Sequence, residues 1–218
     1  MTDPSGVATT VHLLRHGRVH NPDGILYGRL PGYRLSVSGL AMADAAAESL
    51  NGHDIRYLAA SSLDRAQQTA GAFADRVALP IVTDDRLIEA DNVFAGTQVT
   101  GAGGSLFKPS NWAKLRNPRT PSWGEPYLDI AHRMLGAIYT AQAAAAGAEA
   151  VLVSHQLPIW TIRRFLTGKR LWHSPTSRQC SLASLTSLLF VDGVFQEVRY
   201  SEPAAHIDAA DDPVEAGA

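Results

Sequence analysis

The sequence has a single cysteine, Cys180, among 218 residues, which excludes a disulfide within the chain. Cys180 stands in an apolar run, residues 180–185, so we expect a buried structural thiol rather than a nucleophile. No stretch is apolar over the length of a membrane span, and residues 1–10 lack the basic start and apolar centre of a signal peptide. We therefore expect a cytoplasmic protein with no membrane partner.

An excess of charge of one sign is also lacking, because 19 Lys and Arg stand against 21 Asp and Glu. This balance gives no overall basic field, so nucleic acid is not an expected partner. Hydrophobic residues make up 45% of the chain, which is ordinary for a folded domain of this length. We expect one domain over residues 1–202 and a flexible, acidic, alanine-rich tail over 203–218.

Short apolar runs alternate with segments of helical composition. The apolar runs predict strands over residues 11–14, 57–60, 80–82 and 151–153. Helices are predicted over residues 38–50, around 65–73, from about 126 to 146, and from about 158 to 166. Ser38 is the expected N-cap of the first helix, and Pro126 suits the first turn of the third.

Two further segments complete the expected fold. Residues 92–123 are rich in glycine and proline and predict an irregular lid. Asp192-Gly193 lies between two apolar runs and predicts a tight hairpin. The alternation predicts an α/β fold of three layers, αβα: a mostly parallel central sheet with helices on both faces and an antiparallel edge strand.

Ligands bind outside the carboxyl ends of the strands in such sheets. Arg15-His16-Gly17 and Ser154-His155 each follow a predicted strand, so both should lie at this edge. Arg65 falls in the first turn of a predicted helix, where backbone N–H groups already favour an anion. Glu89 adds a carboxylate, and together these residue types predict a phosphate site.

These segments, with Ser-Ser-Leu-Asp-Arg-Ala-Gln-Gln-Thr-Ala at residues 61–70, resemble the histidine phosphatase superfamily, the phosphoglycerate-mutase-like family, of branch 1 type. The resemblance covers residues from about 11 to 200. It implies His16 as the nucleophile and Glu89 as the proton donor. The phosphate pocket that it implies consists of Arg15, Arg65 and His155, assisted by Asn21 and the backbone at Gln156.

The chemistry sets requirements on the protonation of these groups. His16 can attack phosphorus only through an unprotonated nitrogen, so a backbone carbonyl should hold its other nitrogen. His155 would gain from being cationic, and Glu89 must be protonated to serve the leaving oxygen. Asp91, two residues from Glu89, remains an alternative proton donor.

The resemblance leaves the activity and the substrate open. Arg18 replaces the glutamate that usually follows Arg-His-Gly in phosphoglycerate mutases, which favours a phosphatase over a mutase. A non-catalytic module that binds a phosphate ligand is the alternative of another class. The expected substrate is a small phosphorylated metabolite, a sugar phosphate or a phosphoglycerate. The residues that would favour an acidic substrate are Arg18, His20, Tyr27 and Arg29. A homodimer is left open.

No metal and no cofactor are expected in this site. His12, His16 and His20 have the i, i+4 spacing of a helical metal site, but residues 11–14 read as strand, where such positions lie far apart. The sequence shows no partner pattern for His53, His132, His173 and His206.

Overall fold

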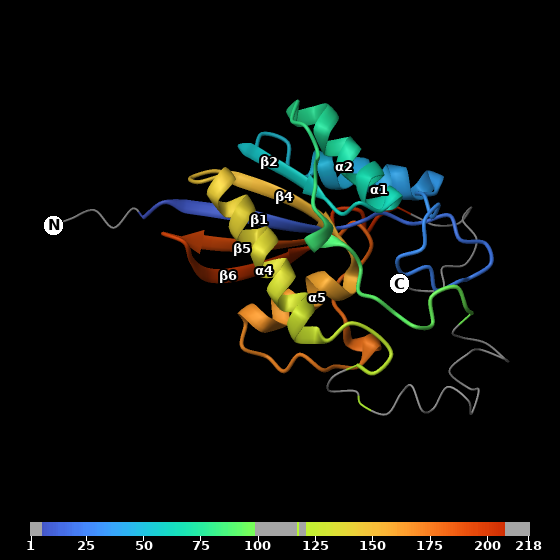
Figure 1. Ribbon diagram of the computed structural model, residues 1–218. Helices are drawn as coiled ribbons and strands as arrows, with labels where there is room; N and C mark the ends of the chain where they lie inside the picture. Colours follow the sequence, from blue (N-terminus) through green and yellow to red (C-terminus); the bar gives the residue numbers. More distant parts are fainter. Residues whose placement is uncertain (1–5, 99–116, 118–120, 208–218) are drawn as a thin grey trace.

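The computed structural model describes residues 6–98, 117 and 121–207, and its strands form one six-stranded sheet of order β3-β2-β4-β1-β5-β6 (Figure 1). The strands are β1 Ala8–Arg15, β2 Ile55–Ala60, β3 Val82–Thr83, β4 Glu149–Ser154, β5 Leu185–Val191 and β6 Val194–Ser201. The first four strands of that order run parallel to one another, whereas β5 is antiparallel to β1 and β6 is antiparallel to β5. The antiparallel part is thus a whole hairpin, with β6 as the edge strand.

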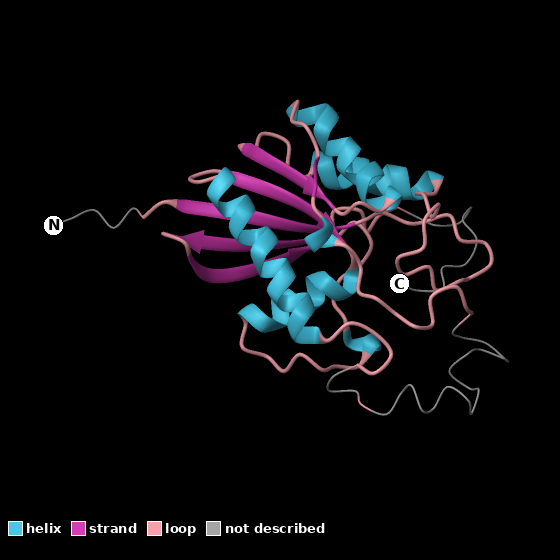
Figure 2. Ribbon diagram, viewed as in Figure 1, coloured by secondary structure: helices cyan, strands magenta, loops and turns pink. Residues whose placement is uncertain are grey.

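Four α-helices of the described residues cover the two faces of the sheet (Figures 1 and 2). They are α1 Val37–Glu48, α2 Asp64–Val77, α4 Tyr127–Ala144 and α5 Gln156–Leu166, with short 3-10 helices η1 Asp85–Leu87 and η4 Pro175–Ser177. Helices α1 and α2 pack on one face, and α4 and α5 pack on the other. The predicted three-layer α/β fold is confirmed.

The central strand β1 shows how the sequence builds this core. Its side chains alternate between the faces, so Val11 and Leu13 pack with α4 while Leu14 packs with α1 and α2. All three are fully buried. Burial of each such side chain contributes about 1.5–3 kcal/mol. This alternation places His12 on the same face as Leu14.

Two helix starts differ from their predicted positions. Ser36, rather than Ser38, caps α1, because its hydroxyl accepts the Gly39 N–H at 3.0 Å while its backbone N–H bonds Arg18. Helix α5 begins at Gln156, two residues before the predicted start at about Pro158. Pro158 lies in the first turn, where its missing N–H breaks no helical hydrogen bond.

The hairpin between β5 and β6 is confirmed. Its turn residues Asp192 and Gly193 have φ of 49° and 81°, the left-handed pair that a tight hairpin requires. Beyond β6, residues 203–206 form turns, and Ala204 is buried against the core. The packed part of the chain therefore continues past the predicted boundary at residue 202, and residues 208–218 lie outside the described part.

The remaining expectations concern Cys180, the lid and the membrane. Cys180 is buried, and burial raises its pKa to about 11, as expected of a structural thiol. Most of the predicted lid, residues 99–116 and 118–120, lies outside the described residues. Within the ranges that are described, no helix has the length and apolar character needed to cross a bilayer.

Candidate active site

The two histidines that follow strands come together at the carboxyl edge of the sheet. The parallel register of β1 and β4 pairs Arg15 with Ser154, so His16 and His155 are the next residues of neighbouring strands. A backbone hydrogen bond of 3.1 Å from His16 to Ser154 continues the ladder by one residue. The two imidazole rings lie with their centroids 5.1 Å apart, and both side chains are fully buried. Strand pairing alone thus brings together residues that are 139 positions apart in the sequence.

His16 has the arrangement that a nucleophilic imidazole requires. Its Nδ1 donates to the carbonyl oxygen of Gly17 at 2.8 Å, which leaves Nε2 with the lone pair. Nε2 is buried and has no hydrogen-bond partner among the described residues. Burial, followed by the charges of Arg65 and Arg15, lowers the pKa of His16 well below its ordinary value. The imidazole is therefore neutral at neutral pH.

Gly17 is required by close packing of backbones. A Cβ at this position would lie 2.3 Å from the carbonyl oxygen of Gly39, at the start of α1. The backbone N–H of Gly17 also donates to Thr69 on α2 at 3.1 Å, and the Thr69 hydroxyl donates to the Arg65 carbonyl at 2.7 Å. The segment after β1 is thus fixed against both helices of this face, which holds the His16 ring in place.

His155 differs from the sequence expectation in its charge. We expected a cationic imidazole, but burial and the neighbouring cations, with Arg65 first among them, lower its pKa well below the ordinary value. Its Nε2 lies 2.9 Å from the hydroxyl of Ser61, and that oxygen already accepts the Leu63 N–H at 3.3 Å. Ser61 can donate its hydroxyl proton to Nε2, and this tautomer puts the ring proton on Nδ1, which is buried without a partner among the described residues. A neutral His155 can then donate its Nδ1–H to a phosphoryl oxygen without being cationic.

Arg65 provides the fixed positive charge of the site. It is fully buried in the first turn of α2, and its Nη2 donates to the Gly28 carbonyl at 2.6 Å. Its guanidinium lies over the Tyr27 ring, 4.7 Å from the centroid. Its Nε and Nη1 have no partner among the described residues, although both are buried. Such donors need an acceptor, and an anionic ligand supplies one.

Arg15 also lies within the site, with 5% of its surface exposed. Its Nη1 donates to the carbonyl oxygen of Cys180 at 2.9 Å. This contact anchors the side chain to the segment before β5. Its charge contributes to lowering the pKa values of both His16 and His155.

The structure separates the two alternative proton donors, Glu89 and Asp91. Glu89 is 4% exposed, and burial raises its pKa above the ordinary value, against the opposing effects of the Ala90 N–H and of Arg65. Asp91 is exposed, and its carboxylate accepts the N–H of Asn92. A raised pKa keeps a carboxyl protonated at higher pH, so the geometry favours Glu89 as the general acid.

Three side chains hold the segment that carries Glu89. Ser154 donates to the Leu87 carbonyl at 2.6 Å, Arg133 to the Arg86 carbonyl at 2.6 Å, and Arg29 to the Glu89 carbonyl at 2.6 Å. Glu125 accepts from both arginines, which orients them toward this segment. Arg29, expected at the substrate, is therefore engaged in positioning Glu89.

The Asn21 side chain bonds a loop backbone, whereas the backbone of Gln156 lies directly after His155. Both amide atoms of Asn21 bond the backbone of Ile25, at 2.9 and 3.1 Å, and so close the loop before Tyr27. Gln156 is the first residue of α5, so its backbone N–H lies at a helix N-terminus next to His155. His20 is exposed.

No pattern in the sequence pointed to Arg178 or to the contact that Ser61 makes in the site. Arg178 donates to Gln156 Oε1 at 3.2 Å and to His173 Nε2 at 2.9 Å, and its charge acts on Glu89. It follows η4 in an irregular segment, where no periodicity points to a site. Ser61 lies inside the quoted motif, and only its contact with His155 reveals its function.

The two buried neutral histidines predict a loss of stability in acid. Their folded pKa values lie below the unfolded value of about 6.5, so the unfolded chain binds more protons as the pH falls below that value. Their contribution to the free energy of unfolding is complete above about pH 6.5 and is lost on acidification toward the folded pKa values. Replacing His155 by asparagine should reduce the dependence of the free energy of unfolding on pH by up to about 1.4 kcal/mol per pH unit.

Urea unfolding at several pH values between 7.5 and 5.5 measures this dependence. The exposed His132→Ala variant serves as control. Identical slopes for wild type and His155→Asn would contradict the assignment of a lowered pKa.

Comparisons with known proteins agree with this geometry. A family model described as histidine phosphatase superfamily (branch 1) matches residues 11–203. The uncharacterized protein Rv0525 of Mycobacterium tuberculosis (strain H37Rv) is 54% identical over 197 residues, which cover 90% of this chain and 98% of that protein. A probable phosphoglycerate mutase of Yersinia enterocolitica is 30% identical over 165 residues, 72% of this chain and 74% of that protein. Among solved structures, the mycobacterial glucosyl-3-phosphoglycerate phosphatase Rv2419c superposes with a TM-score of 0.68 at 27% identity, over 89% of this chain and 96% of that one.

Proposed function

The chain belongs to branch 1 of the histidine phosphatase superfamily, and from this we propose that it hydrolyses phosphomonoesters through a phosphohistidine on His16. The observation that carries the proposal is that His16 Nε2, two Arg65 donors and Glu89 Oε2 are all buried without partners among the described residues, with the His155 ring beside His16 and the pKa of Glu89 raised. A nucleophile, an oxyanion clamp and a proton donor are the three parts that transfer of a phosphoryl group needs.

The first half of the reaction forms the phosphohistidine. The Nε2 lone pair of His16 attacks phosphorus, and the P–O bond to the leaving group breaks. Glu89 gives its proton to the departing oxygen, which leaves as the alcohol. Arg15, Arg65 and the Nδ1–H of His155 donate to the phosphoryl oxygens, where the charge of the transition state lies.

The second half releases phosphate. Glu89, now a carboxylate, takes a proton from a water molecule as that water attacks phosphorus and the P–N bond breaks. His16 returns to its neutral state, inorganic phosphate leaves, and Glu89 is again protonated. We infer that the two arginines supply the positive charge that a metal ion supplies in other phosphatases, so hydrolysis proceeds without a metal.

The substrate that we propose is a small anionic phosphoester of the sugar phosphate or phosphoglycerate class. Arg178 supports this choice, because its charge acts on Glu89, which serves the leaving group. An acidic leaving group would find a cation there. The similarity to a solved glucosyl-3-phosphoglycerate phosphatase points to the same class.

A phosphoglycerate mutase is the second candidate, favoured by the relative of that name in Yersinia enterocolitica. The same phosphohistidine would serve both activities, since a mutase must only keep water away until the intermediate reorients. Arg18, in place of the usual glutamate after Arg-His-Gly, favours the phosphatase.

Phosphate release in the presence of a chelator tests the proposal. The panel contains 3-phosphoglycerate, a glucosylated phosphoglycerate, sugar phosphates and a neutral alkyl phosphate. We expect turnover of at least one acidic ester that the chelator does not reduce and that exceeds turnover of the neutral ester. Exchange between 2- and 3-phosphoglycerate without release would favour the mutase, and binding without either reaction would favour a non-catalytic module.

A further inference from the structure

A second cluster of titratable side chains lies at the other end of β1. His12 Nε2 and His53 Nδ1 approach the same carboxylate oxygen, Oε2 of Glu149, at 2.7 and 2.8 Å. The three donor atoms lie within 4.8 Å of one another. Nothing in the sequence indicated that His53 has a partner, because Glu149 is distant in the chain and only the fold brings the two together.

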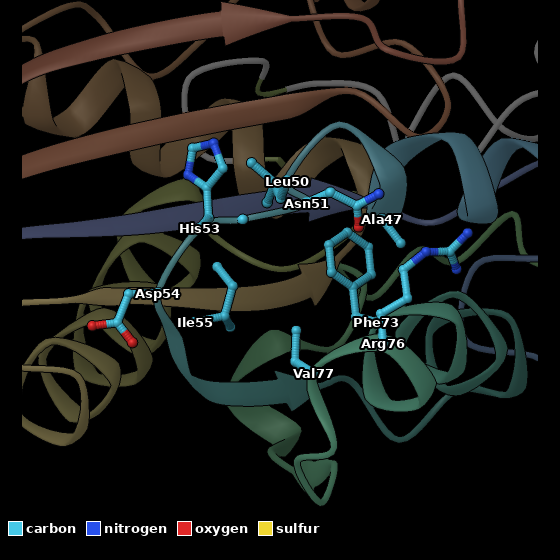
Figure 3. A pocket seen from close by; sticks show the side chains of 10 residues that line it. Ala47, Leu50, Asn51, His53, Asp54, Ile55, Phe73, Arg76 and Val77 are labelled. Carbon is cyan, nitrogen blue, oxygen red and sulfur yellow. The ribbon is translucent and has the colours of Figure 1, made fainter.

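The sheet determines why these residues meet. Glu149 is the first residue of β4, and the register pairs it with Thr10 on β1 and with Ile55 on β2. His12 is two residues along β1 from Thr10, on the face toward α1 and α2. His53 lies in the loop from α1 to β2, just before Ile55. Figure 3 shows that the His53 and Asp54 side chains leave this loop in different directions. Asp54 pairs instead with Arg56.

A hydrogen bond outside the cluster orients the buried member. Nδ1 of His12 lies 2.8 Å from the hydroxyl of Ser187 on β5, so Nε2 is the nitrogen that faces Glu149. His12 is only 4% exposed, and its ring is fixed between two strands. A second bond that sets the tautomer and direction of the ring is what metal-binding histidines have in proteins.

We propose that His12, His53 and Glu149 bind one divalent transition metal ion of the zinc class. Two imidazole nitrogens and one carboxylate oxygen are a donor set that zinc accepts, with bonds of about 2.0–2.2 Å. Tetrahedral bonds of this length place the donor atoms about 3.3 Å apart. The nitrogens must therefore move about half an ångström away from Oε2. The exposed His53 ring, on a loop, and the partly exposed Glu149 carboxylate can make this adjustment while His12 stays in place.

The surroundings give the ion access and a free coordination position. The cluster opens into a pocket of about 700 Å³. The polar residues that line this pocket beside the cluster are Thr10, Ser49, Ser187, Arg199, Tyr200, Ser201 and Glu202. Three protein ligands leave a fourth position on zinc, and the pocket has room there for water or a small anion.

The site is separate from the phosphate site. His12 precedes His16 by four residues along an extended strand, a distance of about 13 Å. An ion at Glu149 therefore cannot contact a phosphoryl group at His16. It would join β1, β4 and the loop before β2, so its effect should be on stability rather than on turnover.

Zinc titration of the untagged protein against a chromophoric chelator tests the proposal. We expect one ion per chain and a higher melting temperature with zinc. His53→Ala, which removes an exposed ligand, should weaken binding at least about 100-fold, since loss of an outer-shell partner alone typically costs 10–100-fold. Glu149→Gln should do the same, and His132→Ala, an exposed histidine elsewhere, should bind as wild type does.

Three outcomes would overturn the proposal. The first is that the wild type does not bind one zinc ion per chain. The second is that His53→Ala and Glu149→Gln bind zinc as tightly as the wild type does. The third is that His16→Ala no longer binds zinc. The last outcome would place the ion between the two active-site histidines. Phosphate release in chelator is measured on the same samples, so a failure of the proposed phosphatase activity is distinguished from a failure of metal binding.

Discussion

His16→Ala is expected to lower kcat for phosphate release by about 10⁴-fold or more, because it removes the atom that forms the bond to phosphorus. The neighbouring imidazole of His155 does not replace it, because the Nε2 of His155 lies 2.9 Å from the Ser61 hydroxyl. Binding of inorganic phosphate should survive, since Arg15, Arg65 and His155 remain. Single-turnover kinetics with a labelled ester, together with phosphate binding by calorimetry, measures both quantities.

The matched control for this variant is His132→Ala. His132 is an exposed histidine on α4 with no role in the site, so its loss should leave kcat within a few-fold of wild type. Rapid quenching should trap label on the wild-type protein and on His132→Ala, but none on His16→Ala. Turnover of His16→Ala at the wild-type rate would show that another group is the nucleophile, and the phosphohistidine mechanism would have to be abandoned.

Glu89→Gln is expected to have the second largest effect, a fall in kcat of about 10²–10⁴-fold, the usual contribution of a general acid. The wild type needs Glu89 protonated, and burial raises its pKa, so kcat/KM should decline as the pH rises through that raised value. Glutamine does not titrate, and the alkaline decline should disappear with it. The pH profile of kcat/KM therefore checks the role as well as the magnitude.

The leaving group provides a further check on Glu89. An aryl phosphate with an acidic phenol needs little help from a proton donor, whereas an alkyl phosphate needs much. In Glu89→Gln, the rate at which the phosphohistidine forms should therefore fall strongly with the alkyl ester and only slightly with the aryl ester. Asp91→Asn serves as control and should leave both substrates nearly unaffected, because Asp91 is exposed. The reverse pattern between the two variants would assign the acid to Asp91.

Much of the fold and of the candidate site could be predicted because its signals are local. Residues 11–14 and 151–153 are apolar over the length of a strand, and Asp192-Gly193 favours the left-handed conformations of a tight hairpin. The positions of His16 and His155 directly after strands follow from the same pattern. Helix starts were predicted less accurately: Ser36, and not Ser38, caps α1, because its hydroxyl accepts the Gly39 N–H.

The sequence by itself determined the fold class and which residue types stand at the strand ends, since hydrophobic period and turn chemistry are properties of neighbouring residues. Only the tertiary structure decided the protonation of these groups. A pKa depends on what surrounds a side chain, and packing buries His155 beside Arg65, so it is neutral where a cation was expected. The same reason applies to Glu89, to Arg178 and to the cluster of His12, His53 and Glu149: contacts between segments that are distant in the chain leave no periodic trace in the sequence.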